Sequence, residues 1–129
     1  MIEIMKMKIK ISDDRKIFEI QEEFNRIFPY LKIEFFSSPH KTGIGTPKKL
    51  IKNNNDTLGT CRKVHKNGFL YITPLMTVSE LEQLLYEAYG LGVQVFRKSG
   101  KVWLETTVTD SWTLADQNKE GEALSLIKR

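Results

Sequence analysis

The stretch from Thr77 to Gly90 constrains the fold more than any other part of the chain, because helix start, helix face and helix stop signals agree within it. Thr77 and Glu80 have the spacing of a capping box, in which each side chain bonds the backbone N–H of the other residue. Apolar residues then recur every three or four positions and indicate one buried face: Val78, Leu81, Leu84, Leu85, Ala88 and Tyr89. Gly90 supplies the left-handed residue at which such helices end.

A β-hairpin is predicted directly after this helix. Residues 92–98 and 101–108 are rich in β-branched and aromatic side chains and flank a Ser-Gly pair. A two-residue turn there pairs Phe96 with Trp103 and places both rings on one face. A three-residue loop with a bulge pairs Phe96 with Val102 and separates the rings. In the first register the face of the rings also carries Gln94, Lys98, Lys101 and Glu105, and the opposite face carries Val93, Val95, Val102 and Leu104.

The N-terminal part of the chain predicts a strand, a helix and a second strand. Residues 5–11 alternate between apolar side chains and lysine, with the period of a half-buried strand. Residues 12–14, Ser-Asp-Asp, can cap a helix whose apolar stripe runs from Ile17 to Phe28, and the next residue is a helix-breaking proline. Residues 31–35 alternate again. If the two strands are neighbours, we expect them to be parallel.

The excess positive charge lies in the middle of the chain. Residues 41–66 contain seven basic residues and one acidic residue, whereas the whole chain has a formal net charge of +4. Residues 37–56 are rich in Gly, Pro and Asn and show no periodicity, so we expect a long basic loop there. Residues 57–65 and 69–73 are then predicted to be two strands around an Asn67-Gly68 turn.

The remaining signals complete an α+β domain. Thr113 and Asp116 form a second capping pattern that opens a short helix, which Gly121 is expected to end. Residues 122–129 fit a final helical turn, a strand or a frayed end. No internal repeat or domain boundary is apparent. The order β-α-β-loop-β-β-α-β-β-α predicts one domain over residues 1–129, with helices on one face of a mainly antiparallel sheet.

One segment carries a resemblance. Residues 95–107, VFRKSGKVWLETT, and residues 109–114, TDSWTL, resemble a segment of small bacterial proteins of unknown function. The resemblance covers about the C-terminal half of the chain. It implies no activity, cofactor or site residue.

Composition favours a soluble, cytoplasmic protein. Hydrophobic residues make up 40% of the chain and charged residues 28%, as in ordinary globular domains. The single cysteine, Cys61, cannot form an internal disulfide, which fits a reducing compartment. No apolar run has the length of a membrane span or the pattern of a signal peptide. We therefore expect no membrane contact, no cofactor and no metal.

Catalytic motifs are weak. The stretch from Gly43 to Lys49 lacks the spacing of a phosphate-binding loop. Cys61, His65 and His40 are the only soft ligands or nucleophiles, and on one strand Cys61 and His65 would lie about 13 Å apart. A buried structural cysteine and a surface histidine are favoured. Glu105, Asp110 and Asp116 lie near the two tryptophans in the sequence, and a carboxylate beside an indole can act as an acid. Turn and cap roles explain Asp110 and Asp116 more simply.

The sequence therefore favours a non-enzymatic binding module that uses the basic loop and the aromatic hairpin. Nucleic acid or another polyanion is one alternative ligand, because flexible lysines bind phosphate and exposed rings stack on bases. A protein partner or a second copy of the chain, anchored by a tryptophan or an edge strand, is another. A small hydrolase-type enzyme is the least favoured alternative. The candidate binding residues are Lys41, Lys48, Lys49, Lys52, Arg62, Lys63, Lys66, Phe96 and Trp103.

Overall fold

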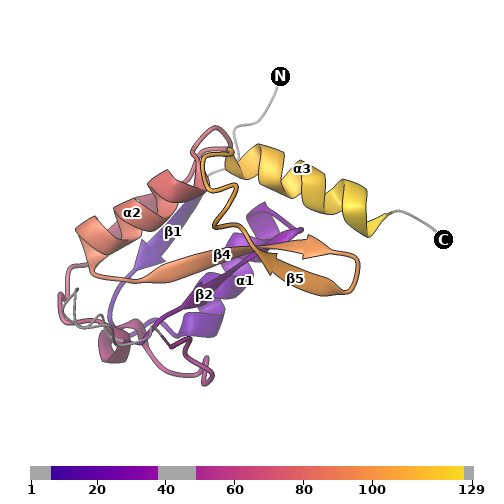
Figure 1. Cartoon of the computed structure of the whole chain (residues 1–129). Coiled ribbons are helices and arrows are strands. Elements are labelled where there is room, and N and C mark those ends of the chain that lie inside the picture. The colour runs from indigo at the N-terminus through magenta and orange to yellow at the C-terminus, as the bar shows by residue number, and fades with distance from the viewer. Residues whose placement is uncertain (1–6, 38–48, 127–129) are drawn as a thin grey trace.

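The computed structural model describes residues 7–37 and 49–126, which form an α+β fold with antiparallel sheets, as predicted (Figure 1). The predicted helix from Thr77 is confirmed, with Thr77 and Glu80 in a capping box and Gly90 at a φ of 66°. In chain order the elements are β1 (Lys8–Ile11), α1 (Ile17–Ile27), β2 (Leu31–Phe35), the 3-10 helix η1 (Leu58–Cys61), β3 (Gly68–Tyr71), α2 (Val78–Tyr89), β4 (Val93–Ser99), β5 (Val102–Glu105) and α3 (Leu114–Ser125).

The first two strands are not neighbours, so the condition under which we expected them to be parallel is not met. β1 pairs with β3, and β2 pairs with β4, so two antiparallel sheets form instead of one. The reason is that α1 covers the edge of β2. The side-chain amides of Gln21 and Asn25 donate to the carbonyl oxygens of Ile33 and Leu31, at 3.0 and 2.9 Å. A helix therefore occupies the place where β1 would have paired.

The fold contains an internal repeat that the sequence analysis did not find. Unit A (residues 8–35) and unit B (residues 69–97) each run strand, turn, helix, strand. Adding 61 to a residue number in the first strand or helix of unit A gives its counterpart in unit B. Six counterpart pairs are buried in both units: Ile9 and Leu70, Ile11 and Ile72, Ile17 and Val78, Ile20 and Leu81, Phe24 and Leu85, and Phe28 and Tyr89. These side chains form most of the core.

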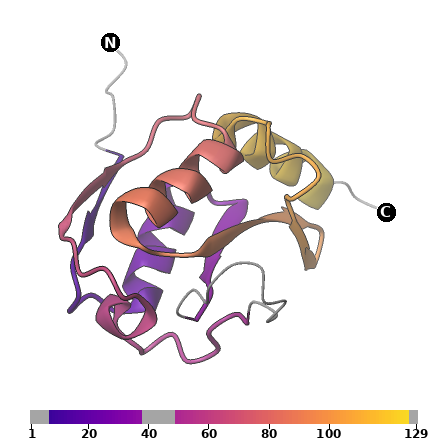
Figure 2. The ribbon, with the colours of Figure 1, turned by 60° about the vertical axis from the view of Figure 1, so that its left-hand side comes forward.

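The units pair with each other as the subunits of a two-fold-symmetric dimer would. In the β1–β3 sheet, Ile9 lies opposite its own counterpart Leu70. In the β2–β4 pair, Ile33 lies opposite Val95, which occupies the same place in the second strand of unit B. An antiparallel pair centred on equivalent residues is the signature of a two-fold relation. In Figure 2 the β1–β3 sheet lies on the left and the β4–β5 hairpin on the right.

The helix N-termini follow the same reciprocal rule. Thr77 and Thr113, which precede α2 and α3, form an isolated β-bridge, and Lys16 and Thr57 form another before α1 and η1. At each bridge the first two amides of one helix donate to carbonyls that precede the other helix, at 2.8–3.1 Å. Helix N-termini have amides without partners inside the helix. Here the residues that precede one helix provide carbonyl partners for the free amides at the N-terminus of another helix.

Two strand and turn predictions in the middle of the chain are wrong. The expected strand at 57–65 contains η1, because Thr57 belongs to the reciprocal bridge and the following residues turn into a helix. The expected Asn67-Gly68 hairpin is absent, since β3 pairs with β1. Gly68 has no positive φ. A Cβ at this position would lie 2.5 Å from the Tyr89 hydroxyl oxygen, so the glycine serves a close approach and not a turn.

The expected end of α3 at Gly121 is also wrong. The helix continues to Ser125, and Gly121 is buried. A Cβ there would meet the Tyr30 Cβ at 2.9 Å and the Arg97 Cγ at 3.1 Å. Gly121 therefore lets α3 pack closely against the start of β2 and the middle of β4.

Neither predicted register of the β4–β5 hairpin is correct. Ser99 pairs with Val102, and Lys98 pairs with Trp103. The turn residues are thus Gly100, at a φ of 63°, and Lys101. A two-residue hairpin turn with a positive φ only at its first central residue favours glycine there. The register differs by two residues from the predicted two-residue turn. A shift by two keeps every side chain on its face, so Phe96 and Trp103 still share one face.

We expect Gly68→Ala to lower the free energy of unfolding by about 1–3 kcal/mol, because a new Cβ overlaps the Tyr89 hydroxyl. Urea unfolding followed by circular dichroism measures the change. In a Tyr89→Phe background the same substitution should cost less. Gly92→Ala is the matched control, since its Cβ would meet Phe36 at an ordinary 3.6 Å. Equal costs at both glycines would contradict this account.

Candidate functional site

Phe96 and Trp103 lie on the outer face of the three-stranded sheet, together with Lys32 and Lys98. We name these four residues the aromatic face. The Lys32 Nζ lies 5.3 Å from the centre of the Phe96 ring and 5.1 Å from that of Trp103. The Lys98 Nζ lies 6.0 Å from the Trp103 ring. Both rings are partly exposed, and cations at these distances are attracted by the ring faces.

A groove of about 320 Å³ begins at the aromatic face. Trp103, residues of β2 that include Lys32, residues of α1 and Asn54 line it. Asn54 belongs to the basic loop, whose described part returns from the end of β2 to α1. Leu50 bridges to Phe36, and the Asn54 carbonyl accepts from the Phe18 amide at 2.9 Å. The loop and the hairpin, predicted as separate contact regions, thus border one groove.

Four of the six candidate lysines lie in the described residues, in two separate places. Lys41 and Lys48 lie outside the described residues. Lys49 and Lys52 are exposed on the loop segment that reaches the groove, and Lys63 and Lys66 are exposed near η1. Lys49 and Lys52 therefore lie on the segment that contributes Asn54 to the groove, whereas Lys63 and Lys66 lie on another segment.

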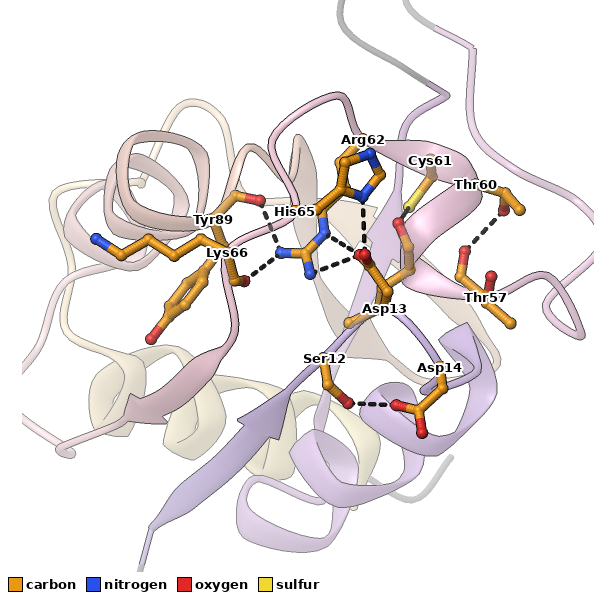
Figure 3. A network of polar contacts seen from close by, with 11 residues as sticks. Ser12, Asp13, Asp14, Thr57, Thr60, Cys61, Arg62, His65, Lys66 and Tyr89 are labelled. Atoms are coloured by element: carbon orange, nitrogen blue, oxygen red, sulfur yellow. Dashed lines mark hydrogen bonds and ion pairs between the residues drawn. The ribbon is translucent and has the colours of Figure 1, made fainter.

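Arg62 was expected on the surface but is buried, with its side chain fully inaccessible. Its guanidinium donates to the Asp13 carboxylate at 2.8 and 3.0 Å. It also donates to the carbonyl oxygens of Lys66 and Tyr89, at 2.8 and 3.1 Å (Figure 3). Arg62 thus connects the end of β1, the chain after η1 and the C-terminus of α2, where a positive charge is favourable.

Asp13 also accepts a hydrogen bond from His65. The imidazole Nδ1 lies 2.8 Å from the second carboxylate oxygen, and His65 is exposed to solvent. Desolvation raises the pKa of Asp13, but the hydrogen bonds and charges of His65 and Arg62 outweigh it, so the pKa lies below its ordinary value. Asp13 therefore stabilises the fold as a carboxylate above its unfolded-state pKa, and this contribution is lost as the pH falls through the lowered value.

Cys61 sits beside this network without entering it. Its thiol is buried and donates to the Leu58 carbonyl. Burial raises the pKa of the thiol to about 11, which disfavours the thiolate that a nucleophile needs. The expectation of a buried structural cysteine and a surface histidine is confirmed.

The three acids considered for catalysis are spread over separate elements. The Thr113 hydroxyl accepts from the Asp116 amide as a helix cap, and the Asp110 carbonyl accepts from Ser79. Glu105 is exposed at the end of β5. Trp112 is 40% exposed and lies against Arg97. The turn and cap roles predicted for Asp110 and Asp116 are therefore confirmed.

Sequence reasoning missed the Asp13–Arg62–His65 network and the role of Lys32. Asp13 and Arg62 are 49 positions apart, and no local pattern joins them. Lys32 had a usable signal, because it alternates with apolar residues in a strand and so had to face outwards. What was missing was the pairing of β2 with β4, which places Lys32 opposite Phe96.

No protein-family model, curated protein or solved structure matches this chain. In the described residues, no helix is long and apolar enough to cross a membrane.

We expect Arg62→Met to lower the free energy of unfolding by about 3 kcal/mol, because it leaves buried acceptors without a donor. Thermal and urea unfolding measure the loss. Lys63→Met, which changes an exposed neighbour, should change stability by less than about 0.5 kcal/mol. An unchanged unfolding midpoint for Arg62→Met would refute its role as a structural connection.

Proposed function

We propose that this protein is a cytoplasmic binding module that recognises a protein partner through the aromatic face and the adjoining groove. The observation that carries the proposal is the placement of two partly exposed rings, Phe96 and Trp103, at 5.3 and 5.1 Å from the Lys32 Nζ on one face of the sheet. Tryptophan is enriched at the energetic centres of protein interfaces. The single, buried cysteine supports a reducing compartment.

The charges around the rings favour a protein partner over a polyanion for this face. Lys32 makes an ion pair with Glu34 at 3.2 Å. Glu105, opposite Phe96 in the sheet, adds a second acid to the same face. A phosphate chain needs an excess of positive charge, whereas an apolar centre with a rim of mixed charge is typical of protein interfaces.

The edge of the sheet supports the same proposal. β5 is the edge strand of the β2–β4–β5 sheet. On the face opposite Trp103, Val102 and Leu104 are 55% and 41% exposed. An exposed edge strand with apolar side chains on both faces can accept an extended segment of another protein as an additional strand. The partner would then contact Trp103 on one side of the sheet and Leu104 on the other.

We expect Trp103→Ala to weaken partner binding at least tenfold, because truncation removes the central ring of the contact. A photoreactive amino acid at position 103 would capture the partner in cells, and calorimetry with the purified partner would measure affinity. Lys49→Ala with Lys52→Ala should weaken binding less.

Tyr86→Ala is the matched control, since Tyr86 is 50% exposed on α2, away from the aromatic face. Equal losses for Trp103→Ala and Tyr86→Ala would contradict the proposed surface. Binding of nucleic acid that Trp103→Ala abolishes would replace the protein partner with the polyanion alternative.

A further inference from the structure

A second aromatic surface lies on the outer face of the β1–β3 sheet. It consists of Lys8, Lys10, Phe69 and Tyr71, and we name it the β1–β3 face. The inner face of this sheet holds Ile9, Ile11 and Leu70, which are almost completely buried. Phe69 and Tyr71 are 44% and 62% exposed. Two adjacent exposed rings on one strand do not contribute to the core and need another explanation.

The four side chains form an ordered array. Lys8 lies opposite Tyr71, and Lys10 lies opposite Phe69. The ring centres are 6.4 Å apart and inclined by 45°. The Lys8 Nζ lies 4.7 Å from the centre of the Phe69 ring. Rings on one strand thus run parallel to positive charges on the next strand.

The charge of this face differs from that of the aromatic face. Neither Lys8 nor Lys10 makes an ion pair in the described part of the chain. Among the described residues, two acids follow β1: Asp13 is bound to Arg62 and His65, and Asp14 accepts from the Ser12 hydroxyl and lies within electrostatic reach of Lys10. The β1–β3 face therefore presents positive charge without compensating carboxylates on its own strands.

The internal repeat shows that the scaffold does not require these side chains. Lys8 is the counterpart of Phe69, and Lys10 is the counterpart of Tyr71. Unit A thus carries lysines on its strand at the places where unit B carries rings. Since both strands occupy equivalent positions in the same sheet, the folding of a strand tolerates either residue type there.

We propose that the β1–β3 face binds single-stranded nucleic acid. Phe69 and Tyr71 would stack on successive bases, and Lys8 and Lys10 would contact the phosphates, which is how sequence-tolerant single-strand binding surfaces are built. A hollow of about 570 Å³ continues the face beyond Lys10 and Phe69. Ser12, Asp13, Asp14 and Asn67 line it. The Asn67 amide offers a hydrogen-bonding group for a base edge, and the carboxylates can accept from a base amino group or a sugar hydroxyl.

Fluorescence anisotropy of the full chain with a labelled 12-nucleotide oligo(U) and oligo(dT) tests this proposal. Wild type should bind with an affinity that falls as salt rises. Tyr71→Leu should weaken binding about tenfold, whereas Tyr71→Phe, which keeps the ring, should retain it. Lys8→Gln with Lys10→Gln should reduce the slope of log K against log salt by about 1.4, at roughly 0.7 for each phosphate contact.

Trp103→Ala serves as the control, because Trp103 lies on the other sheet. Its binding of oligonucleotide should equal that of wild type, which also makes this test independent of the proposed protein partner. Absence of binding by wild type would overturn the proposal, as would equal affinities of Tyr71→Leu and Tyr71→Phe. Sedimentation showing a wild-type dimer that Phe69→Ala dissociates would also overturn it, because the face would then bind a second copy.

Discussion

Two strand pairs, β1 with β3 and β2 with β4, join unit A to unit B, and the rest of the structure depends on them. Neither unit pairs its own two strands with each other, so the backbone hydrogen bonds of each unit are completed by the other. The apolar faces of α1 and α2 then have one common core to fill. The bridges at the helix N-termini apply the same reciprocity to amides that a helix cannot satisfy by itself.

The repeat also explains where the candidate surfaces lie. After its second strand, unit A continues into the basic loop and η1, whereas unit B continues into the β5 hairpin and α3. The loop and the hairpin are therefore counterpart segments on one symmetric scaffold. Both reach the groove that Asn54 and Trp103 line. These two segments differ in structure, whereas the strands and helices of the two units share one core, and binding surfaces commonly lie on such connecting segments.

Local signals in the sequence predicted the elements well, and long-range signals failed. The capping boxes, apolar stripes and alternating strands depend on neighbours in sequence, so α2, β2 and the hairpin could be predicted. Glycine was ambiguous. Gly90 and Gly100 have positive φ, as a turn requires, whereas Gly68 and Gly121 are needed because Tyr89 and Tyr30 come close. Only the tertiary structure distinguishes these two uses.

The candidate site shows the same division. The shared face of Phe96 and Trp103 was predicted by one of the two registers considered, the two-residue turn, and the observed register keeps it because the shift is two residues. Lys32 lies beside those rings because β2 pairs with β4, and this strand order could not be predicted. Arg62 is buried because it binds Asp13, which is distant in sequence. The repeat was missed because the two units share the order of their elements and the spacing of their buried residues, but mostly not the residues themselves. Only strand pairing reveals that Ile9 lies opposite its own counterpart.

Native-state hydrogen exchange tests most directly whether the two units complete each other. The measurement compares free energies of opening for core amides in the β1–β3 sheet and in the β2–β4 pair. Because each sheet contains one strand from each unit, we predict the same free energy for both sheets, equal to that of global unfolding. Opening of all unit A amides at a clearly lower free energy than those of unit B would contradict the account.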